Sequence, residues 1–180
     1  HLRDSGGAAE IFVGTDTLRL EGYAISDIGE GLALSHEAFV FAGQQLSGDA
    51  GDNVLLGADG ADTLVGLDGN DSLSGGRGQD SLTGSNGMDV LNGGDGDDYM
   101  DGAGGRDTLH GDAGDDTLLG GAGDDRILGG DGADSILGGS GDDTLDGNAG
   151  HDTMSGGTGS DLMSGGAGKD QIAVAKGDTV

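Results

Sequence analysis

The sequence predicts an all-β protein: a parallel β-roll (β-solenoid) of about seven 18-residue coils with an N-terminal β cap. Two observations predict this fold. The chain has 44 Gly among its 180 residues, far more than the usual ~7%, and a nine-residue period runs unbroken through residues 47–172. A fixed period that continues over many units is the signature of an architecture in which each unit stacks on its neighbours.

Fourteen nonapeptides fill residues 47–172 without an insertion. Counted from Ser47, positions two and five are always Gly, position seven is Asp in thirteen units and Asn53 in the first, and position nine is Leu, Ile or Met. Because Gly permits positive φ angles, we expect a tight turn over the first six positions and a short strand over the last three. Two units would complete one coil with a strand on each side, and the ninth positions would form the only core.

The unit resembles the nonapeptide of the RTX (repeats-in-toxin) family, the hemolysin-type calcium-binding repeat G-G-x-G-x-D-x-U-x, and Leu137–Leu145 (LGGSGDDTL) is a clear example. The second Gly of that motif is replaced in several units, for example by Ala58, Leu67, Ser85, Ala103 and Asn148. The resemblance implies a right-handed parallel β-roll. It also implies calcium ions between adjacent turns of one edge, held by both aspartates and by turn carbonyl groups.

The residues themselves also point to a metal that is part of the fold. One buried apolar side chain per nine residues cannot offset the conformational entropy that ordering nine residues costs. Stacking brings residues 18 apart together, so that Asp62 faces Asp80 on one edge and Asp71 faces Asp89 on the other. Two carboxylates ~4.8 Å apart repel by about 3.5 kcal/mol at an effective dielectric constant of about 20. A divalent cation between the coils reverses the sign of that interaction.

Calcium is the metal that these ligands favour. Carboxylate and carbonyl oxygens are hard donors, and a flexible cage without phosphate favours calcium over magnesium. The last Glu is Glu37, and every later acidic residue is the shorter Asp, which suggests that the carboxylate must close back on its own turn. Seven turns per edge leave six gaps, so we expect about twelve calcium ions. The expected ligands are position seven (Asn53, Asp62, Asp71, Asp80, Asp89, Asp98, Asp107, Asp116, Asp125, Asp134, Asp143, Asp152, Asp161 and Asp170) and, mainly through carbonyl groups, position four (Asp59, Asp68, Asn86, Asp95 and Asp131).

The segments on either side of the repeats differ from them. Alternating apolar residues predict short strands at Glu10–Val13, Thr17–Glu21 and Leu32–Phe41. Because a solenoid needs its open end covered, we expect residues 1–46 to be a β-rich cap over the first coil; the alternative is the end of a preceding domain. Residues 173–180 resemble the start of the strand that flanks such rolls, truncated in this chain.

Composition excludes several classes of protein. The chain has no Pro, as collagen would need, and no Cys for disulfides or thiolate metal sites. No apolar run is long enough to span a membrane, and a net charge of -27 disfavours nucleic acid as a partner. No catalytic motif is present, and we expect no enzymatic activity from this chain. His110 and His151 occupy variable positions and are expected to be exposed.

The leading hypothesis is a calcium-binding module of a secreted bacterial protein, and the resemblance implies type I secretion from a Gram-negative cell. The module would stay unfolded in a low-calcium cytosol and fold as a monomer on binding calcium outside the cell or at its surface. The alternative is an auxiliary module that binds an acidic polysaccharide or a cell-surface glycan, as in alginate epimerases, or the tail of an RTX protease or lipase. An ice-binding solenoid is least favoured, since position eight is Thr in only five units. Leu119, Leu128 and Leu137, at position one, would form an outer ladder or an interaction patch.

Overall fold

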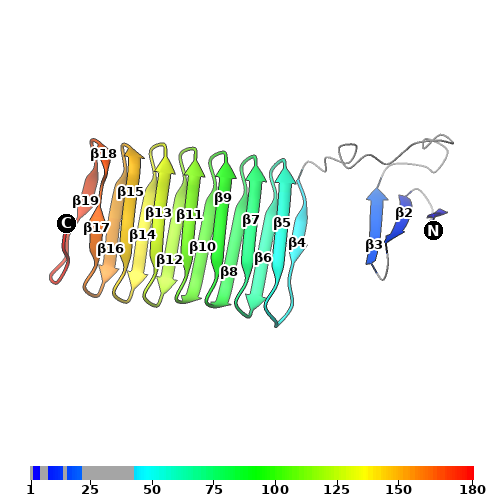
Figure 1. Cartoon of the computed structure of the whole chain (residues 1–180), viewed down its shortest axis with the longest axis horizontal. Coiled ribbons are helices and arrows are strands. Elements are labelled where there is room, and N and C mark those ends of the chain that lie inside the picture. The colour runs from blue at the N-terminus through cyan, green and yellow to red at the C-terminus, as the bar shows by residue number, and fades with distance from the viewer. Residues whose placement is uncertain (1, 5–7, 14–15, 22–42) are drawn as a thin grey trace. The chain divides into compact units, whose positions relative to one another are not determined.

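The computed structural model describes residues 2–4, 8–13, 16–21 and 43–180 (Figure 1). The chain divides into two compact units, His1–Phe39 and Val40–Val180, and each is described by itself. Every regular element in the described residues is a β-strand. The predicted fold class is confirmed: the second unit is a parallel β-solenoid of about seven coils.

The first unit contains a three-stranded antiparallel sheet in the order β1-β2-β3. Its strands are Leu2–Asp4, Ala8–Val13 and Asp16–Glu21. The strands expected at Glu10–Val13 and Thr17–Glu21 therefore lie within β2 and β3. The strand expected at Leu32–Phe41 lies outside the described residues, and the role of residues 1–46 as a cap stays a prediction.

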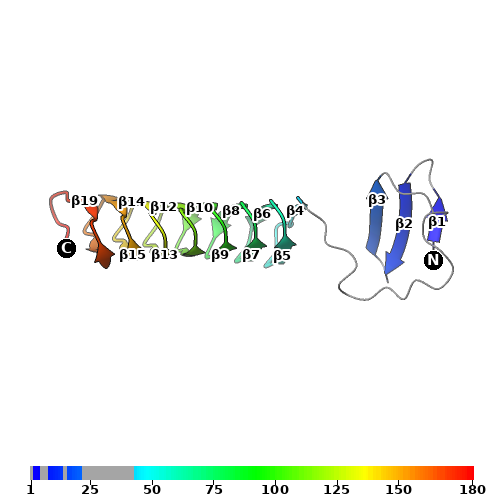
Figure 2. The ribbon, with the colours of Figure 1, turned by 90° about the horizontal axis from the view of Figure 1, so that it is seen from above.

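The second unit consists of two parallel sheets whose strands alternate along the chain. One runs in the order β4-β6-β8-β10-β12-β14-β16-β19 and the other in the order β5-β7-β9-β11-β13-β15-β17, with β18 paired to β15. Figure 2 shows the strands of the first sheet along one side of the roll and those of the second sheet along the other. The bounds are β4 Gln45–Ser47, β5 Val54–Asp59, β6 Thr63–Asp68, β7 Ser72–Arg77, β8 Ser81–Gly87, β9 Val90–Asp95, β10 Tyr99–Gly105, β11 Thr108–Ala113, β12 Thr117–Ala122, β13 Arg126–Asp131, β14 Ser135–Ser140, β15 Thr144–Gly150, β16 Thr153–Thr158, β17 Leu162–Ser164, β18 Ala167–Gly168 and β19 Gln171–Ala173.

The pairing register is 18 residues throughout the repeats. Met100 pairs with Leu118 in the β4–β19 sheet, and Leu109 pairs with Ile127 in the β5–β17 sheet. Equivalent positions of every second nonapeptide therefore form straight columns along the roll. This register is what stacks chemically identical side chains on each edge.

The strands are longer than the sequence suggests. A typical strand such as β6 covers positions eight and nine of one nonapeptide and positions one to four of the next, so only positions five to seven form the turn. Positions three and four pair with the neighbouring coils even though position three has a positive φ angle. The expected six-residue turn is wrong because positions one, three and four of each nonapeptide pair with the neighbouring coils and so belong to the strand.

The core is one column of apolar side chains per sheet, as predicted from the ninth positions. The twelve buried members are Leu64, Leu73, Leu82, Leu91, Met100, Leu109, Leu118, Ile127, Ile136, Leu145, Met154 and Met163. Leu46, Leu55 and Ile172 are partly buried against them at the two ends. Burial alternates along each strand, so position nine and the position-two Gly point inward while positions eight and one point outward.

The position-one leucines do not form one ladder. Leu119 and Leu137 pair on the outer face of the β4–β19 sheet, whereas Leu128 lies in the β5–β17 sheet, between His110 and Asp146. The 18-residue register separates consecutive nonapeptides onto opposite faces. The three leucines therefore form one pair and one isolated side chain.

Candidate metal centre

The position-seven residues form two columns, one on each edge of the roll. We call them the Asp62 column (Asp62, Asp80, Asp98, Asp116, Asp134, Asp152 and Asp170) and the Asn53 column (Asn53, Asp71, Asp89, Asp107, Asp125, Asp143 and Asp161). Within each column, the backbone N–H of one residue donates to Oδ1 of the aspartate 18 residues later, over 2.7 to 3.1 Å. Each carboxylate therefore binds the coil that precedes its own. The fourteen position-seven residues expected as ligands all lie in these two columns.

The second oxygen of these carboxylates has no partner. In twelve aspartates, from Asp62 to Asp161, Oδ2 is buried and makes no hydrogen bond, and the side chains are at most 3% exposed. A buried carboxylate oxygen without a donor or a cation is strongly unfavourable, and twelve in register are not isolated defects. The columns therefore need positive charge beside each Oδ2.

A carbonyl oxygen lies beside the unpartnered Oδ2 at ten of the twelve position-two Gly residues that face these carboxylates. A Cβ atom built on Gly120 would lie 2.5 Å from Asp125 Oδ2 and 2.5 Å from the Gly138 carbonyl oxygen. The same pair of oxygens converges on Gly57, from Asp62 and Gly75. Two acceptors that face the same space, with no donor between them, fit a bound cation.

This geometry corrects the reason for the position-two Gly. Gly57 and Gly120 have no positive φ angle; the space for a Cβ is taken by the carboxylate and the carbonyl group instead. Positive φ angles occur at positions three and five. Position three keeps this conformation without Gly, as at Leu67 (φ 82°) and Asn148 (φ 67°). Replacing the motif's second Gly therefore leaves the local backbone conformation and the strand pairing intact.

Burial raises the pKa of the stacked carboxyl groups. The pKa of Asp116 rises to about 7, and those of Asp98, Asp107, Asp134 and Asp143 rise to about 6. Loss of solvation is the main cause; the N–H donated to Oδ1 opposes it, and repulsion from stacked aspartates adds to it. The pKa is also raised, again mainly by burial, at Asp80, Asp89, Asp125 and Asp152.

The position-four residues lie at the ends of the strands, directly before the turns. The carbonyl oxygens of Asn86, Asp95 and Asp131 each accept a hydrogen bond from a position-five Gly N–H of the preceding coil, over 2.7 to 3.0 Å. Their side chains interact with each other: Asn86 Nδ2 donates to Asp68 Oδ1 over 2.8 Å. Position four thus joins coils through both its carbonyl groups and its side chains.

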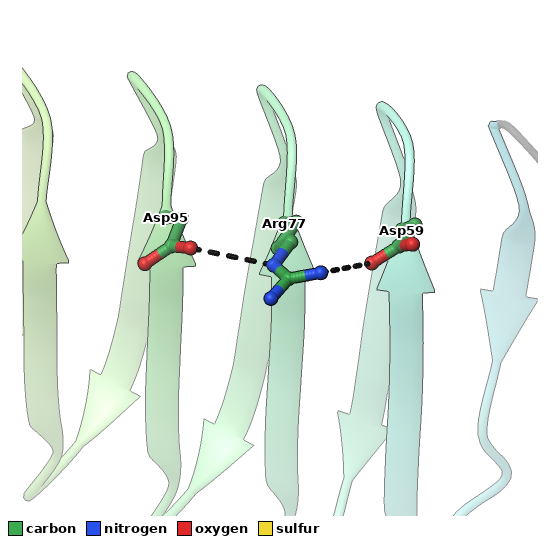
Figure 3. Close-up of polar contacts among 3 residues, drawn as sticks. All are labelled: Asp59, Arg77 and Asp95. Carbon is green, nitrogen blue, oxygen red and sulfur yellow. Dashed lines mark ion pairs between the residues drawn. The ribbon is translucent and has the colours of Figure 1, made fainter.

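An arginine takes a bridging place in the position-four column of the β5–β17 sheet. Arg77 lies between Asp59 and Asp95, with Nη1 3.7 Å from Asp59 and Nε 3.5 Å from Asp95 (Figure 3). All three side chains are exposed. The guanidinium group therefore lies between the exposed carboxylates of the coils before and after its own.

Asp178 is a column residue that the nonapeptide period does not reveal. Its Oδ1 accepts the N–H of Asp161 over 3.4 Å, and the N–H of Thr179 donates to the Asp161 carbonyl group over 2.7 Å. Gly177-Asp178-Thr179-Val180 has the residue order of the repeat with one position missing, so the spacing from Asp161 is 17 residues instead of 18. A search that tolerates one deletion would have found it.

The donors on each edge fit calcium. Within the described ranges, no three His, Asp or Glu side chains gather at one point; the carboxylates are stacked in single file. Backbone carbonyl groups must therefore complete the coordination of any ion. An all-oxygen set of carboxylates and carbonyl groups is what calcium takes in proteins.

The comparisons with known proteins agree with this geometry. The family model of the RTX calcium-binding nonapeptide repeat matches overlapping segments that together span residues 47–180: 47–82, 74–109, 83–118, 110–145, 119–154, 137–172 and 146–180. A comparison with curated proteins finds no match. In the part of the chain that the structure describes, no helix has the length and apolar character to cross a membrane.

Proposed function

The chain belongs to the family of RTX calcium-binding nonapeptide repeats, and on that premise we propose that it is a secreted module that folds when it binds calcium. The single observation that carries this proposal is the set of twelve buried Oδ2 atoms without a partner. Calcium, when bound, supplies the positive charge that these atoms lack. Because the site exists only when the coils are stacked, the free energy of binding is also free energy of folding.

The charge of the repeats supports folding that depends on calcium. Residues 47–172 contain 26 Asp and four Lys or Arg, a net charge of -22. Where calcium is scarce, as in a bacterial cytosol, this charge keeps the chain extended and suitable for export. RTX repeats are typical of secreted proteins, and we propose type I secretion from a Gram-negative cell. The module acts by binding and not by catalysis, which the lack of a catalytic motif supports.

Circular dichroism and calcium titration of the full chain test this function. In chelator we expect an unfolded spectrum, and in millimolar calcium a cooperative change to a β spectrum with about twelve ions bound. The change should not occur with millimolar magnesium, which requires a more rigid octahedral site. A β spectrum that is the same in chelator and in calcium would overturn the proposal.

A second candidate function is glycan binding, and the outer face of the β4–β19 sheet favours it. Position eight of this sheet carries one hydroxyl per coil in register along the roll, from Thr63, Ser81, Tyr99, Thr117, Ser135 and Thr153. This uncharged column suits a neutral polysaccharide better than an acidic one, which the surrounding carboxylates repel. Thr117→Lys should then abolish binding to a neutral insoluble polysaccharide, whereas Thr144→Lys, at position eight of the other sheet, should not. If both variants bind the polysaccharide equally well, the outer face of the β4–β19 sheet is not the glycan-binding surface.

A further inference from the structure

Gln44 occupies the position-seven place at the start of the Asp62 column. Its backbone N–H donates to Asp62 Oδ1 over 2.5 Å, and its carbonyl group accepts the N–H of Thr63 over 2.8 Å. Asp62 makes the same two backbone contacts one coil later, with Asp80 Oδ1 and the N–H of Ser81. Gln44 therefore belongs to the column, although it precedes the first nonapeptide.

The side chain of Gln44 differs from those of the aspartates in the group that it presents. Its Nε2 donates to the carbonyl oxygen of Gly57 over 2.5 Å. One coil later, Asp62 faces the carbonyl oxygen of Gly75 with an unpartnered Oδ2. The first pair is a donor and an acceptor, and the second is two acceptors. Gln44 thus donates a hydrogen bond to the carbonyl group of the position-two residue Gly57, and no ion is needed there.

From this contrast we infer that Gln44 is a metal-independent cap: its amide N–H takes the place of a cation in the first gap of the Asp62 column. Ion binding in that column then begins in the gap between Asp62 and Asp80. Gln44 lies outside the residues that the family repeat matches. The inference rests on the proposed calcium function of the columns, because it identifies the end of the Asp62 column at which no ion is bound.

The first residue of the other column shows that this cap is specific to Gln44. Asn53 also carries an amide, but its Oδ1 accepts the N–H of Asp49 over 2.7 Å. That same Oδ1, and not the amide nitrogen, is the nearest atom to the space beside Gly48, where the Gly66 carbonyl oxygen also lies. Two oxygen atoms therefore face each other in the gap beside Asn53, as they do in the gaps beside the aspartates. Only the Asp62 column begins with a donor.

Calcium stoichiometry by isothermal titration calorimetry of full-length variants tests the cap. Gln44→Glu replaces the donor with a carboxylate, so we expect one more ion than in the wild type. Gln44→Met removes the donor without adding a ligand, so we expect an unchanged stoichiometry and a lower Tm. Gln45→Glu and Gln45→Met, at the exposed neighbouring position, are the matched controls and should change neither quantity.

The possible results separate the cap from the calcium function. Loss of one ion in Gln44→Met would show that Gln44 is itself a ligand and would overturn the cap, as would an unchanged ion count in Gln44→Glu. If the wild type binds no calcium, the proposed function fails, and the cap is judged by its hydrogen bond. The side-chain amide protons of Gln44 should then still exchange with solvent more slowly in NMR spectra than those of Gln45; equal rates would overturn it.

Discussion

The backbone N–H of Asp98 donates to Oδ1 of Asp116 over 2.8 Å, so the carboxylate of one coil is bound to the backbone of the coil before it. The other oxygen of the same carboxylate, Oδ2 of Asp116, is buried without a partner. One side chain therefore has two effects of opposite sign: a hydrogen bond that joins the coils and a charge that drives them apart. Which effect dominates depends on whether a cation is present.

Replacing a column aspartate by asparagine should change stability in opposite directions with and without calcium. Asp107→Asn keeps an oxygen for the N–H of Asp89 but removes the charge beside the carbonyl group of Gly120. In calcium we expect a loss of about 1–3 kcal/mol or more, because a ligand is missing. In chelator the substitution should favour β structure, because a buried charge is gone.

Circular dichroism measures both effects, as the Tm in calcium and as the strength of the β signal in chelator. Asp124→Asn, at an exposed position-six residue, is the control and should change neither quantity much. A change of the same sign for Asp107→Asn in both conditions would contradict this explanation.

Adding a single methyl group at position two should damage a site. The Cβ of Gly120→Ala would occupy the space between Asp125 Oδ2 and the Gly138 carbonyl oxygen. We expect about 1–3 kcal/mol of overpacking and weaker calcium binding in the same variant. Gly104→Ala, where the nearest atoms are 3.6 and 3.7 Å from the new Cβ, is the control and should bind calcium as the wild type does. If the calorimetric calcium titrations of Gly120→Ala and Gly104→Ala coincide, the role assigned to position two is wrong.

Stability without metal should fall as the pH rises. The pKa values of the column carboxyl groups, about 6 to 7 at Asp98, Asp107 and Asp116, lie above the value of about 3.9 in an unfolded chain. Between these values the folded state binds more protons than the unfolded state, so the free energy of unfolding decreases with increasing pH. The metal-free chain should therefore show more β structure at about pH 5 than at about pH 8.

The calcium-loaded chain should respond to pH in the opposite direction, because protons and calcium compete for the same oxygens. Circular dichroism of metal-stripped and calcium-saturated protein over this pH range measures both responses. A metal-free chain that gains structure as the pH rises would contradict the raised pKa values.

The narrow core should be sensitive to the loss of volume and tolerant of changes in shape. Leu118 is fully buried, with Met100 and Ile136 as its ladder neighbours. Leu118→Ala should lower the free energy of unfolding in calcium by about 2–5 kcal/mol. Met100→Leu, which conserves volume, should cost less than about 1.5 kcal/mol. Denaturant titration in saturating calcium compares the two, and equal losses would argue against a packed core.

The sequence could predict the roll because its period determines which residues meet. Position nine identified the core residues from Leu64 to Met163, and position seven identified the two columns, since stacking in steps of 18 follows from two units per coil. The role of the position-two Gly could not be predicted, because it depends on where Asp125 Oδ2 and the Gly138 carbonyl oxygen converge in three dimensions. Gln44 and Asp178 were missed for a different reason: Gln44 lies in register but in a segment without the repeat's Gly and Asp, and Asp178 follows a one-residue deletion, so a strict search for the nonapeptide excludes both.

Because of the 18-residue register, an insertion or deletion in the chain affects the interior of the roll differently from its outer face. Deleting one nonapeptide would move every later unit to the opposite sheet, yet positions seven and nine carry the same residue types in both sheets, so columns and core would form again. The outer face would not survive the same edit: Arg126 and Leu162, now at position eight of the β5–β17 sheet, carry no hydroxyl and would interrupt the hydroxyl column. Insertions and deletions of eighteen residues preserve the pattern of both faces, whereas those of nine preserve only the interior.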